Sequence, residues 1–523
     1  MPQESRVKKS LLNARVNLIF YFLTLALSFF SRKVFLDCLG ANFIGLTGTL
    51  YNLLGFLNLA ELGIGSAIGY VLYKPLFDHN QQKINEIISV MGYLYRWIGF
   101  IILGTGCLLA CFLPLIFPNT GFDLSIIYFA YFSFLASSLI GYFINYRQNL
   151  LGADQRNYVV TAYFQTATII KTIIQMVSAY YTGSYYIWIA LELSFGIIYS
   201  FILNWKINQT YPWLKSEIKE GKTLFKKYPE VIKYTKQLFV QQINGLVQFQ
   251  TTPFLIYTFV SLETVAYYGN YSLVIDKIFA LILTLFSSFR ASIGNLIAGS
   301  NNEYVKDVFW EIGSLRFWIA GIVVFGCFFL MNSFITVWIG EKYILPFYIL
   351  CIILIKFYFQ FILDNSMSFL YGYGLFADVW ASYTQSVIFL VCAIVGGYLW
   401  GLAGILMASL IGILIINGIW KPYYLYKSGF KLPISGYWLS WMKYNVLNVI
   451  NIASSFALLN FLGMLGTKHT LGDFVVQAIV VLLTYTLICT LTFSIFSKHF
   501  RVSATRLYSQ ITRKGVQSNE KQI

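Results

Sequence analysis

Charged side chains inside long apolar runs are the residues of this sequence that could do chemistry. The basic residues inside such runs are Arg96, Lys171, Lys277, Arg316 and Lys356. Arg32 joins them if the first run continues to the outer membrane interface. The acidic residues inside runs are Glu61, Glu192, Asp276 and Asp364. A single charge at the centre of a bilayer costs about 2.5–3.5 kcal/mol even on a permissive insertion scale. If the runs span a membrane, these side chains must therefore line a protein interior.

The position of each charge within its run separates binding from anchoring. Lys171 lies near the middle of a run, where its side chain cannot easily reach the interface, so it is predicted to line a cavity. Arg96 and Arg316 lie within two turns of the predicted inner ends of their runs, which favours snorkelling to the interface. Glu192 is interpreted either as a structural hydrogen-bonding group or as part of a charge network.

Two close pairs of opposite charge are also present. Asp276 and Lys277 are adjacent and therefore about 100° apart around a helix, so both could border one cleft. Lys356 and Asp364 are separated by two helical turns and share one face. That second spacing suits either a ligand site or a stabilising network between helices.

Glu61 stands in the most unusual run, which covers residues 42–73. This run is predicted to be one helix and is rich in small residues, including Gly45, Gly48, Gly55 and Gly69. Small residues let the backbones of membrane helices approach closely. An acid in a membrane-spanning run is costly unless it faces a partner or a wet cavity.

The composition indicates a polytopic membrane protein that would hold these charges on helices. Of the 523 residues, 58% are hydrophobic and 11% are charged, whereas soluble domains carry about 25% charged residues. Runs of about 20 apolar residues predict fourteen transmembrane helices. They cover roughly 14–36, 42–73, 88–114, 123–146, 157–181, 184–205, 232–259, 262–291, 309–338, 344–370, 378–399, 402–425, 442–464 and 474–497.

Basic residues are concentrated in alternate loops and at the helix flanks beside them, where Lys421 is one example, and this is the pattern of cytoplasmic loops. Because an even number of helices places both ends on one side, both termini are predicted to be cytoplasmic. The formal charge of +16 then follows from membrane topology and needs no nucleic-acid partner. The first run is too long for a signal peptide and is predicted to be a retained helix.

A weak internal repeat divides the chain. Gly48 matches Gly269, and Ser66–Gly69 resembles Ala291–Gly294, at an offset of about 220 residues. The predicted domains are a six-helix lobe at 1–220, a second at 221–430, and two further helices with a basic tail at 431–523. The longest inner loop, 206–231, is predicted to be an amphipathic helix on the inner leaflet, or else a contact site for a cytoplasmic partner.

Catalytic and metal-binding patterns are missing from the sequence. The seven cysteines lie in or beside apolar runs without a CxxC spacing, and the three histidines are scattered, so no metal site is predicted. No P-loop and no large outer loop with acids and histidines is present. The chain is therefore predicted not to be an enzyme; a polysaccharide polymerase or ligase is the enzymatic alternative.

The string SFFSRKVFLDCLGANFIGLTGTLYNLLGFLNLAELGIGSAIGYVLYKPL resembles the start of the Wzx-type polysaccharide and O-antigen flippases. Their superfamily also contains multidrug exporters and the lipid II flippase. The resemblance rests on Arg32-Lys33, Leu39-Gly40, Gly45-Leu46 and Ala60–Gly65. It implies a two-lobed, V-shaped, alternating-access transporter in the bacterial inner membrane. The implied cargo is an undecaprenyl-diphosphate-linked oligosaccharide, and a polymerase and glycosyltransferases are the implied partners beside membrane lipids.

The resemblance also assigns residues. In the lipid II branch, cations on helices 1, 2 and 8 bind the diphosphate, which points here to Arg32 on helix 1 and to Lys277 and Arg290 on helix 8. Helix 2 has no arginine in this sequence. Glu61 matches an acid of that branch and is the predicted gating or ion-coupling group, with H⁺ or Na⁺ as the coupling ion and no other cofactor. Asp276 is a second coupling candidate. The alternative within transport is a multidrug antiporter, which would require an acidic cavity, whereas cations outnumber acids in these runs.

Overall fold

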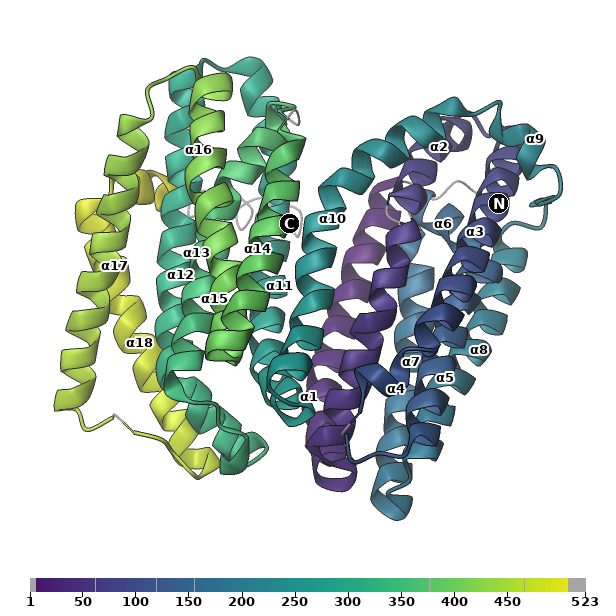
Figure 1. Cartoon of the computed structure of the whole chain (residues 1–523). Helices are drawn as coiled ribbons and strands as arrows, with labels where there is room; N and C mark the ends of the chain where they lie inside the picture. Colours follow the sequence, from purple (N-terminus) through teal and green to yellow (C-terminus); the bar gives the residue numbers. More distant parts are fainter. Residues whose placement is uncertain are drawn as a thin grey trace, which may run out of the picture. The chain divides into compact units, whose positions relative to one another are not determined.

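The computed structural model describes residues 6–61, 63–118, 120–154, 156–375, 378–464 and 466–506. Over these ranges the chain forms helices and no strand (Figure 1). Nine helices in the described ranges are long and apolar enough to cross a membrane. The predicted all-helical, polytopic membrane fold is therefore confirmed, while the predicted count of fourteen spans is not.

The contacts divide the chain into two compact units, Met1–Ala266 and Tyr267–Ile523. The sequence placed its first boundary near residue 220 instead. The difference arises because α10 (Pro229–Phe259) packs against α1 (Arg6–Gly55) and α2 (Ile64–Phe77). The remaining helices of the first unit are α3 (Gln81–Ala110), α4 (Leu113–Ile116), α5 (Leu124–Phe143), α6 (Gln148–Ala153), α7 (Asn157–Thr182), α8 (Tyr185–Thr210) and α9 (Gly221–Phe225). The division falls inside α11 (Leu262–Gly299).

Two glycines with positive φ reshape the predicted first and second helices. α1 bends at Gly40, where φ is +83°, at the predicted boundary between the two runs. The run 42–73 is not one helix, as the sequence predicted. It leaves α1 at Gly55, forms a 3-10 turn over Phe56–Glu61, and resumes as α2 after Gly63, where φ is +87°. Only glycine adopts such angles at little cost, so the break is built into the sequence.

Small residues bring α1 close to its neighbours at some of the predicted positions. A Cβ atom on Gly45 would overlap the backbone at Leu262, and one on Gly55 would overlap the side chain of Gln250. Gly48 and Gly69 have no such neighbour within 4 Å. Close helix approach therefore explains part of the small-residue pattern.

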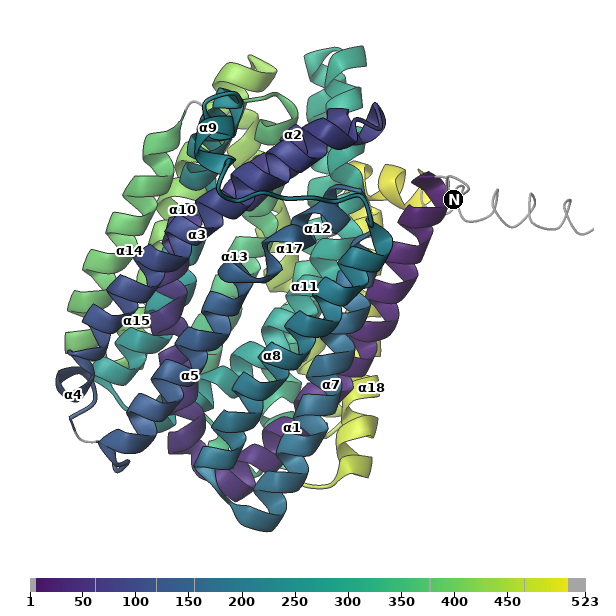
Figure 2. The same ribbon diagram turned by 90° about the vertical axis from the view of Figure 1, so that its right-hand side faces the viewer.

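The segment Tyr211–Tyr228, here called the strap, is not a membrane-surface helix as the sequence predicted. α8 continues to Thr210, and the strap contains only the short helix α9. The strap crosses one end of α3 (Figure 2). The backbone N–H groups of Lys215 and Glu217 donate to Asn85 Oδ1 at 3.0 Å and Ser89 Oγ at 2.9 Å.

The strap also ends on α3. Lys227 Nζ and the Tyr228 hydroxyl both donate to Glu86 Oε2, at 2.7 and 2.6 Å. Burial, followed by the hydrogen bond to the Glu86 carboxylate, raises the pKa of Tyr228 well above its usual range. The strap therefore fixes the start of α10 to the first unit.

The second unit is built around α12 (Asn302–Trp338) and α13 (Phe347–Gly372). Its later helices are α14 (Val379–Trp400), α15 (Leu402–Gly412), α16 (Lys421–Tyr424), α17 (Ser435–Phe461) and α18 (Leu471–Phe496). The predicted C-terminal pair, α17 and α18, packs on α12. Asn448 of α17 donates to Phe317 O of α12 and to the Tyr358 hydroxyl of α13, both at 3.1 Å.

The helix after α15 is widened by two π-helical segments, Ile413–Trp420 and Leu425–Phe430, on either side of α16. Lys421, which the sequence assigned to a cytoplasmic flank, is buried here. Its Nζ lies 2.7 Å from Asp378 Oδ2, and the Trp420 indole donates to the same oxygen at 2.9 Å. The charge is tolerated inside the unit because it is paired and hydrogen-bonded.

Candidate functional site

Glu61 occupies the break between α1 and α2, where its carboxylate meets side chains from two other helices. The Tyr95 hydroxyl of α3 donates to Glu61 Oε1 at 2.6 Å. The Tyr142 hydroxyl of α5 donates to Glu61 Oε2 at 2.8 Å. The 3-10 turn ends at Glu61 and so delivers this side chain into the first unit. We call Glu61, Tyr95, Tyr142 and Asn58 the carboxylate cage.

The cage is closed by neutral groups. Asn149 of α6 donates through Nδ2 to the Tyr95 hydroxyl at 3.3 Å. A Cβ on Gly65 would lie 2.9 Å from that hydroxyl, so glycine leaves room for it. Among the ion pairs within the described ranges, none includes Glu61. Among the described residues, the Glu61 carboxylate is therefore held by tyrosine hydroxyls in place of a cation.

A count of hydrogen atoms in the cage distinguishes two states. Tyr142 has one hydroxyl hydrogen but two acceptors in reach, Glu61 Oε2 at 2.8 Å and Asn58 Oδ1 at 2.9 Å. If Glu61 carries a proton, it donates to Tyr142, which then donates to Asn58, and every group is satisfied. If Glu61 is ionised, turning the Asn58 amide by 180° lets Asn58 donate to Tyr142 and restores satisfaction. The cage thus accommodates both protonation states through one amide rotation.

Lys171 and Glu192 form the second charged group of the first unit. Lys171 Nζ of α7 lies 2.6 Å from Glu192 Oε1 of α8, and both side chains are largely shielded. Gln175 Nε2 donates to Glu192 Oε2 and to Trp188 O, each at 3.1 Å. The structure therefore pairs the predicted cavity cation with the predicted structural acid.

Arg32 lies on α1, as expected, and its guanidinium contacts a backbone oxygen. Arg32 Nη2 donates to Ala266 O, in the first turns of α11, at 2.9 Å. Arg32 therefore holds the start of α11 to α1, and its predicted role in diphosphate binding stays a prediction.

In the second unit, the structure brings together three predicted residues, here called the lysine cluster. Asp276 of α11 interacts electrostatically with Lys356 of α13 and with its neighbour Lys277. The ring of Phe279 packs edge-on against Phe357 at 5.7 Å and brings the two helices together beside the charges. The cluster carries two cations for one acid, and hence a net charge of about +1 when all three are ionised.

Asp364 does not belong to the lysine cluster. It accepts from Arg316 Nη2 at 2.9 Å, while Arg316 Nη1 donates to Phe361 O at 2.8 Å. The prediction that Arg316 snorkels to the interface is therefore wrong, because its side chain is buried, with the guanidinium 4.6 Å from the Phe286 ring centre. Lys356 and Asp364 share a helix face but have different partners. The side chain of Arg290 lies outside the described part of the structure.

Comparisons with known proteins bear on the arrangement as a whole. No protein-family model and no curated protein sequence matches this chain. Solved structures do match it. The lipid II flippase MurJ, in an inward closed conformation, aligns with a TM-score of 0.62 and 16% identity over 91% of this chain and 98% of that one.

Multidrug transporters match as well. An inward-facing multidrug resistance MATE transporter of the MOP superfamily gives a TM-score of 0.57 and 12% identity over 81% of this chain and 99% of that one. A mutant of the Vibrio cholerae MATE transporter VcmN gives 0.50 and 14%, over 81% and 98%. The chain has the fold of these transporters. At such identities the match concerns the fold alone.

Sequence reasoning missed the neutral members of the carboxylate cage. Tyr95 and Tyr142 are two of 39 tyrosines and did not stand out in the sequence, and Asn58 carried no signal. The glycine at 63, just after Glu61, was the available clue, because a positive φ there ends the helix. Asp378, the partner of Lys421, was missed because Lys421 had been assigned to a flank.

Proposed function

We propose that this chain is a flippase that moves an undecaprenyl-diphosphate-linked oligosaccharide from the inner to the outer leaflet of the bacterial inner membrane. The observation that carries the proposal is the fold likeness to a lipid II flippase over nine tenths of the chain. In this proposal the cargo is a repeat unit of O-antigen, capsule or exopolysaccharide. The protein works by alternating access beside a polymerase and glycosyltransferases, with both termini in the cytoplasm and no catalytic step of its own.

The lysine cluster is the proposed diphosphate contact. A diphosphate that crosses hydrocarbon must exchange its water shell for fixed cations, and lysine serves as a compact point charge for this purpose. The two positive charges of Lys277 and Lys356 outnumber the one negative charge of Asp276, so the cluster attracts an anion. The Asp276 carboxylate weakens that attraction, which allows the anion to be released. Lys171 and Arg32 are weaker candidates, because Glu192 and Ala266 O already engage them.

The carboxylate cage is the proposed coupling site, with H⁺ as the coupling ion. Within the described ranges, the side chains that hydrogen-bond to Glu61 are the hydroxyls of Tyr95 and Tyr142, and both donate to the carboxylate. A sodium ion needs several oxygen lone pairs directed at one point, and here the two tyrosine hydroxyls direct their hydrogens, not their lone pairs, at the carboxylate. Protonation requires only the amide rotation of Asn58. This argument favours H⁺ over Na⁺.

A multidrug antiporter is the second candidate, because MATE transporters share the fold. The two functions separate in a vesicle assay. The purified full-length chain is reconstituted with a fluorescent undecaprenyl-diphosphate oligosaccharide, and an impermeant reductant reports the label exposed on the outer face. We expect cargo exposure to accelerate in the presence of a proton gradient. If ethidium is exported and the cargo does not move, the flippase proposal is wrong and the chain is a multidrug antiporter.

A further inference from the structure

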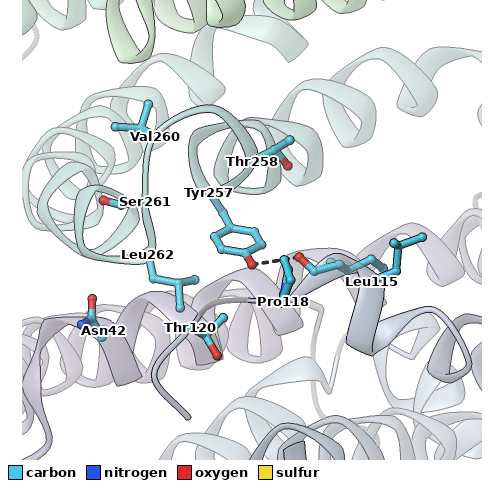
Figure 3. A pocket seen from close by; sticks show the side chains of 10 residues that line it. Asn42, Leu115, Pro118, Thr120, Tyr257, Thr258, Val260, Ser261 and Leu262 are labelled. Atoms are coloured by element: carbon cyan, nitrogen blue, oxygen red, sulfur yellow. Dashed lines mark hydrogen bonds between the residues drawn. The ribbon is translucent and has the colours of Figure 1, made fainter.

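A cavity of about 440 Å³ lies in the first unit, and its lining includes no residue of the carboxylate cage and neither Lys171 nor Glu192. It is formed where three chain segments meet: the bend after Gly40, the α4 region, and the connection from α10 to α11 (Figure 3). Its lining residues are Asn42, Leu115, Ile116, Pro118, Thr120, Tyr257, Thr258, Val260, Ser261 and Leu262. The topology predicted from the basic residues places all three segments on the outer side.

The lining chemistry excludes an ionic ligand. None of the lining residues is charged, and five carry a hydroxyl or an amide. The other five present aliphatic surface. A mixture of neutral hydrogen-bonding groups and apolar patches complements a sugar, whose ring alternates hydroxyl groups with C–H faces. Volumes of a few hundred Å³ are typical of small-molecule sites.

Asn42 supplies an available amide. Within the described ranges its side chain makes no hydrogen bond, so its two N–H donors and its carbonyl oxygen are open to a ligand in the cavity. Such an amide can bind two adjacent sugar hydroxyls at once, accepting from one and donating to the other. The bend at Gly40, two residues earlier, is what turns this segment toward the α10–α11 connection.

Two hydroxyl groups of the lining, those of Tyr257 and Thr258, are oriented as acceptors. Thr258 donates its hydrogen to Phe254 O at 2.9 Å, and Tyr257 donates to Ile116 O at 2.8 Å. Their hydrogens are used within the protein, so their remaining lone pairs can accept from a ligand's hydroxyls. The Tyr257 ring is held in place by stacking on Phe117, with centroids 4.9 Å apart. The aromatic wall is therefore fixed before a ligand arrives.

We propose that this cavity is a subsite for a neutral sugar residue of the cargo glycan, used on the outer side as the glycan leaves. The inference rests on the proposed function for the source of the sugar. The binding chemistry itself needs only a neutral glycan. An acyl chain is a poorer occupant, because it would leave the Asn42 amide and the hydroxyl lone pairs without partners.

Saturation-transfer NMR on the purified full-length chain in nanodiscs tests the subsite with glucose, galactose, N-acetylglucosamine and maltose as probes, and with glucuronate as a charged comparison. We expect transfer to at least one neutral probe at millimolar concentration and a weaker signal from glucuronate. Asn42→Leu and Thr258→Val should each reduce the transfer at least fivefold. Thr168→Val is the matched control, since Thr168 also donates to the carbonyl four residues earlier, on α7.

The outcomes are distinct from those of the vesicle assay. No transfer to any neutral probe, or equal transfer in the Asn42→Leu and Thr168→Val variants, overturns the subsite. An acyl chain retained in the cavity through purification, seen by native mass spectrometry and lost in Asn42→Leu, overturns it as well. If the chain binds neutral sugars at this cavity but moves no lipid-linked cargo, the result supports the subsite and contradicts the proposed function.

Discussion

Lys171 Nζ lies 2.6 Å from Glu192 Oε1 within the first unit, and less than a fifth of each side chain's surface is accessible to solvent. From the sequence alone, Lys171 is predicted to be a cavity cation and Glu192 a structural acid, with no link between them. As a pair they are electrically neutral and stabilise the contact between α7 and α8. Removing either partner leaves an uncompensated charge in a poorly hydrated place.

Lys171→Met should therefore lower the free energy of unfolding by about 3–5 kcal/mol. Lys171→Met combined with Glu192→Met should recover most of that loss, because no isolated charge remains. Thermal unfolding in detergent micelles measures both effects. If the double variant is as unstable as the single variants and is also inactive, the pair has a role beyond mutual neutralisation.

Glu61→Gln should retain the folded cage and abolish the response of transport to a pH gradient. Glutamine can accept from Tyr95 and donate to Tyr142, which reproduces the hydrogen bonds of the protonated acid. The vesicle assay with an imposed proton gradient checks the response, and thermal unfolding checks the fold. Acceleration by the gradient that persists unchanged in Glu61→Gln would contradict the coupling role.

Tyr142→Phe should break the hydrogen-bonded link between Glu61 and Asn58 and leave the rest of the carboxylate cage in place. The variant loses the hydroxyl between Glu61 and Asn58 but keeps the ring and its packing near Tyr95. We expect transport that still responds to a proton gradient, with its half-maximal response displaced in pH relative to the unmodified chain. An unchanged pH profile would show that Tyr142 does not participate in the protonation of Glu61.

Lys277→Glu and Lys356→Glu should each reduce cargo exposure in vesicles more than tenfold. Reversal places a second acid beside Asp276 and repels the diphosphate, and a tenfold change corresponds to about 1.4 kcal/mol. Lys219→Glu, on the exposed face of the strap, is the matched control for charge. Full activity in both cluster variants would move the diphosphate contact elsewhere.

Gly221→Val should loosen the strap. A Cβ at this position would lie 2.6 Å from Ser89 O on α3 and would also meet Tyr93, so the strap cannot stay in place. Overpacking of this kind costs about 1–3 kcal/mol. Trypsin should then cleave at the exposed lysines Lys222 and Lys226 faster than in the unmodified chain. Equal cleavage rates would show that the strap is not tightly held by α3.

The sequence predicted the fold class well because apolar run length and the cost of buried charge are strong signals. It also placed a boundary between two helices near Gly40, where α1 bends without ending. The sequence could not predict which charged residues form ion pairs, because Lys171–Glu192 and Arg316–Asp364 each join two different helices. Residue spacing along one helix does not show which residues of another helix lie beside it. The prediction of a membrane-surface helix for the strap is wrong because a charged, amphipathic segment suits the polar end of α3 as well as it suits a membrane surface.

The two π-helical segments beside α16 have a consequence for comparisons among relatives. A π-helical hydrogen bond spans five residues where an α-helical one spans four, so each wide segment holds an extra residue without lengthening a loop. Relatives with an unbroken α-helix should show gaps at Ile413–Trp420 and Leu425–Phe430. Alignments that instead distribute those gaps into the flanking loops will misplace Lys421 and hide its partner Asp378.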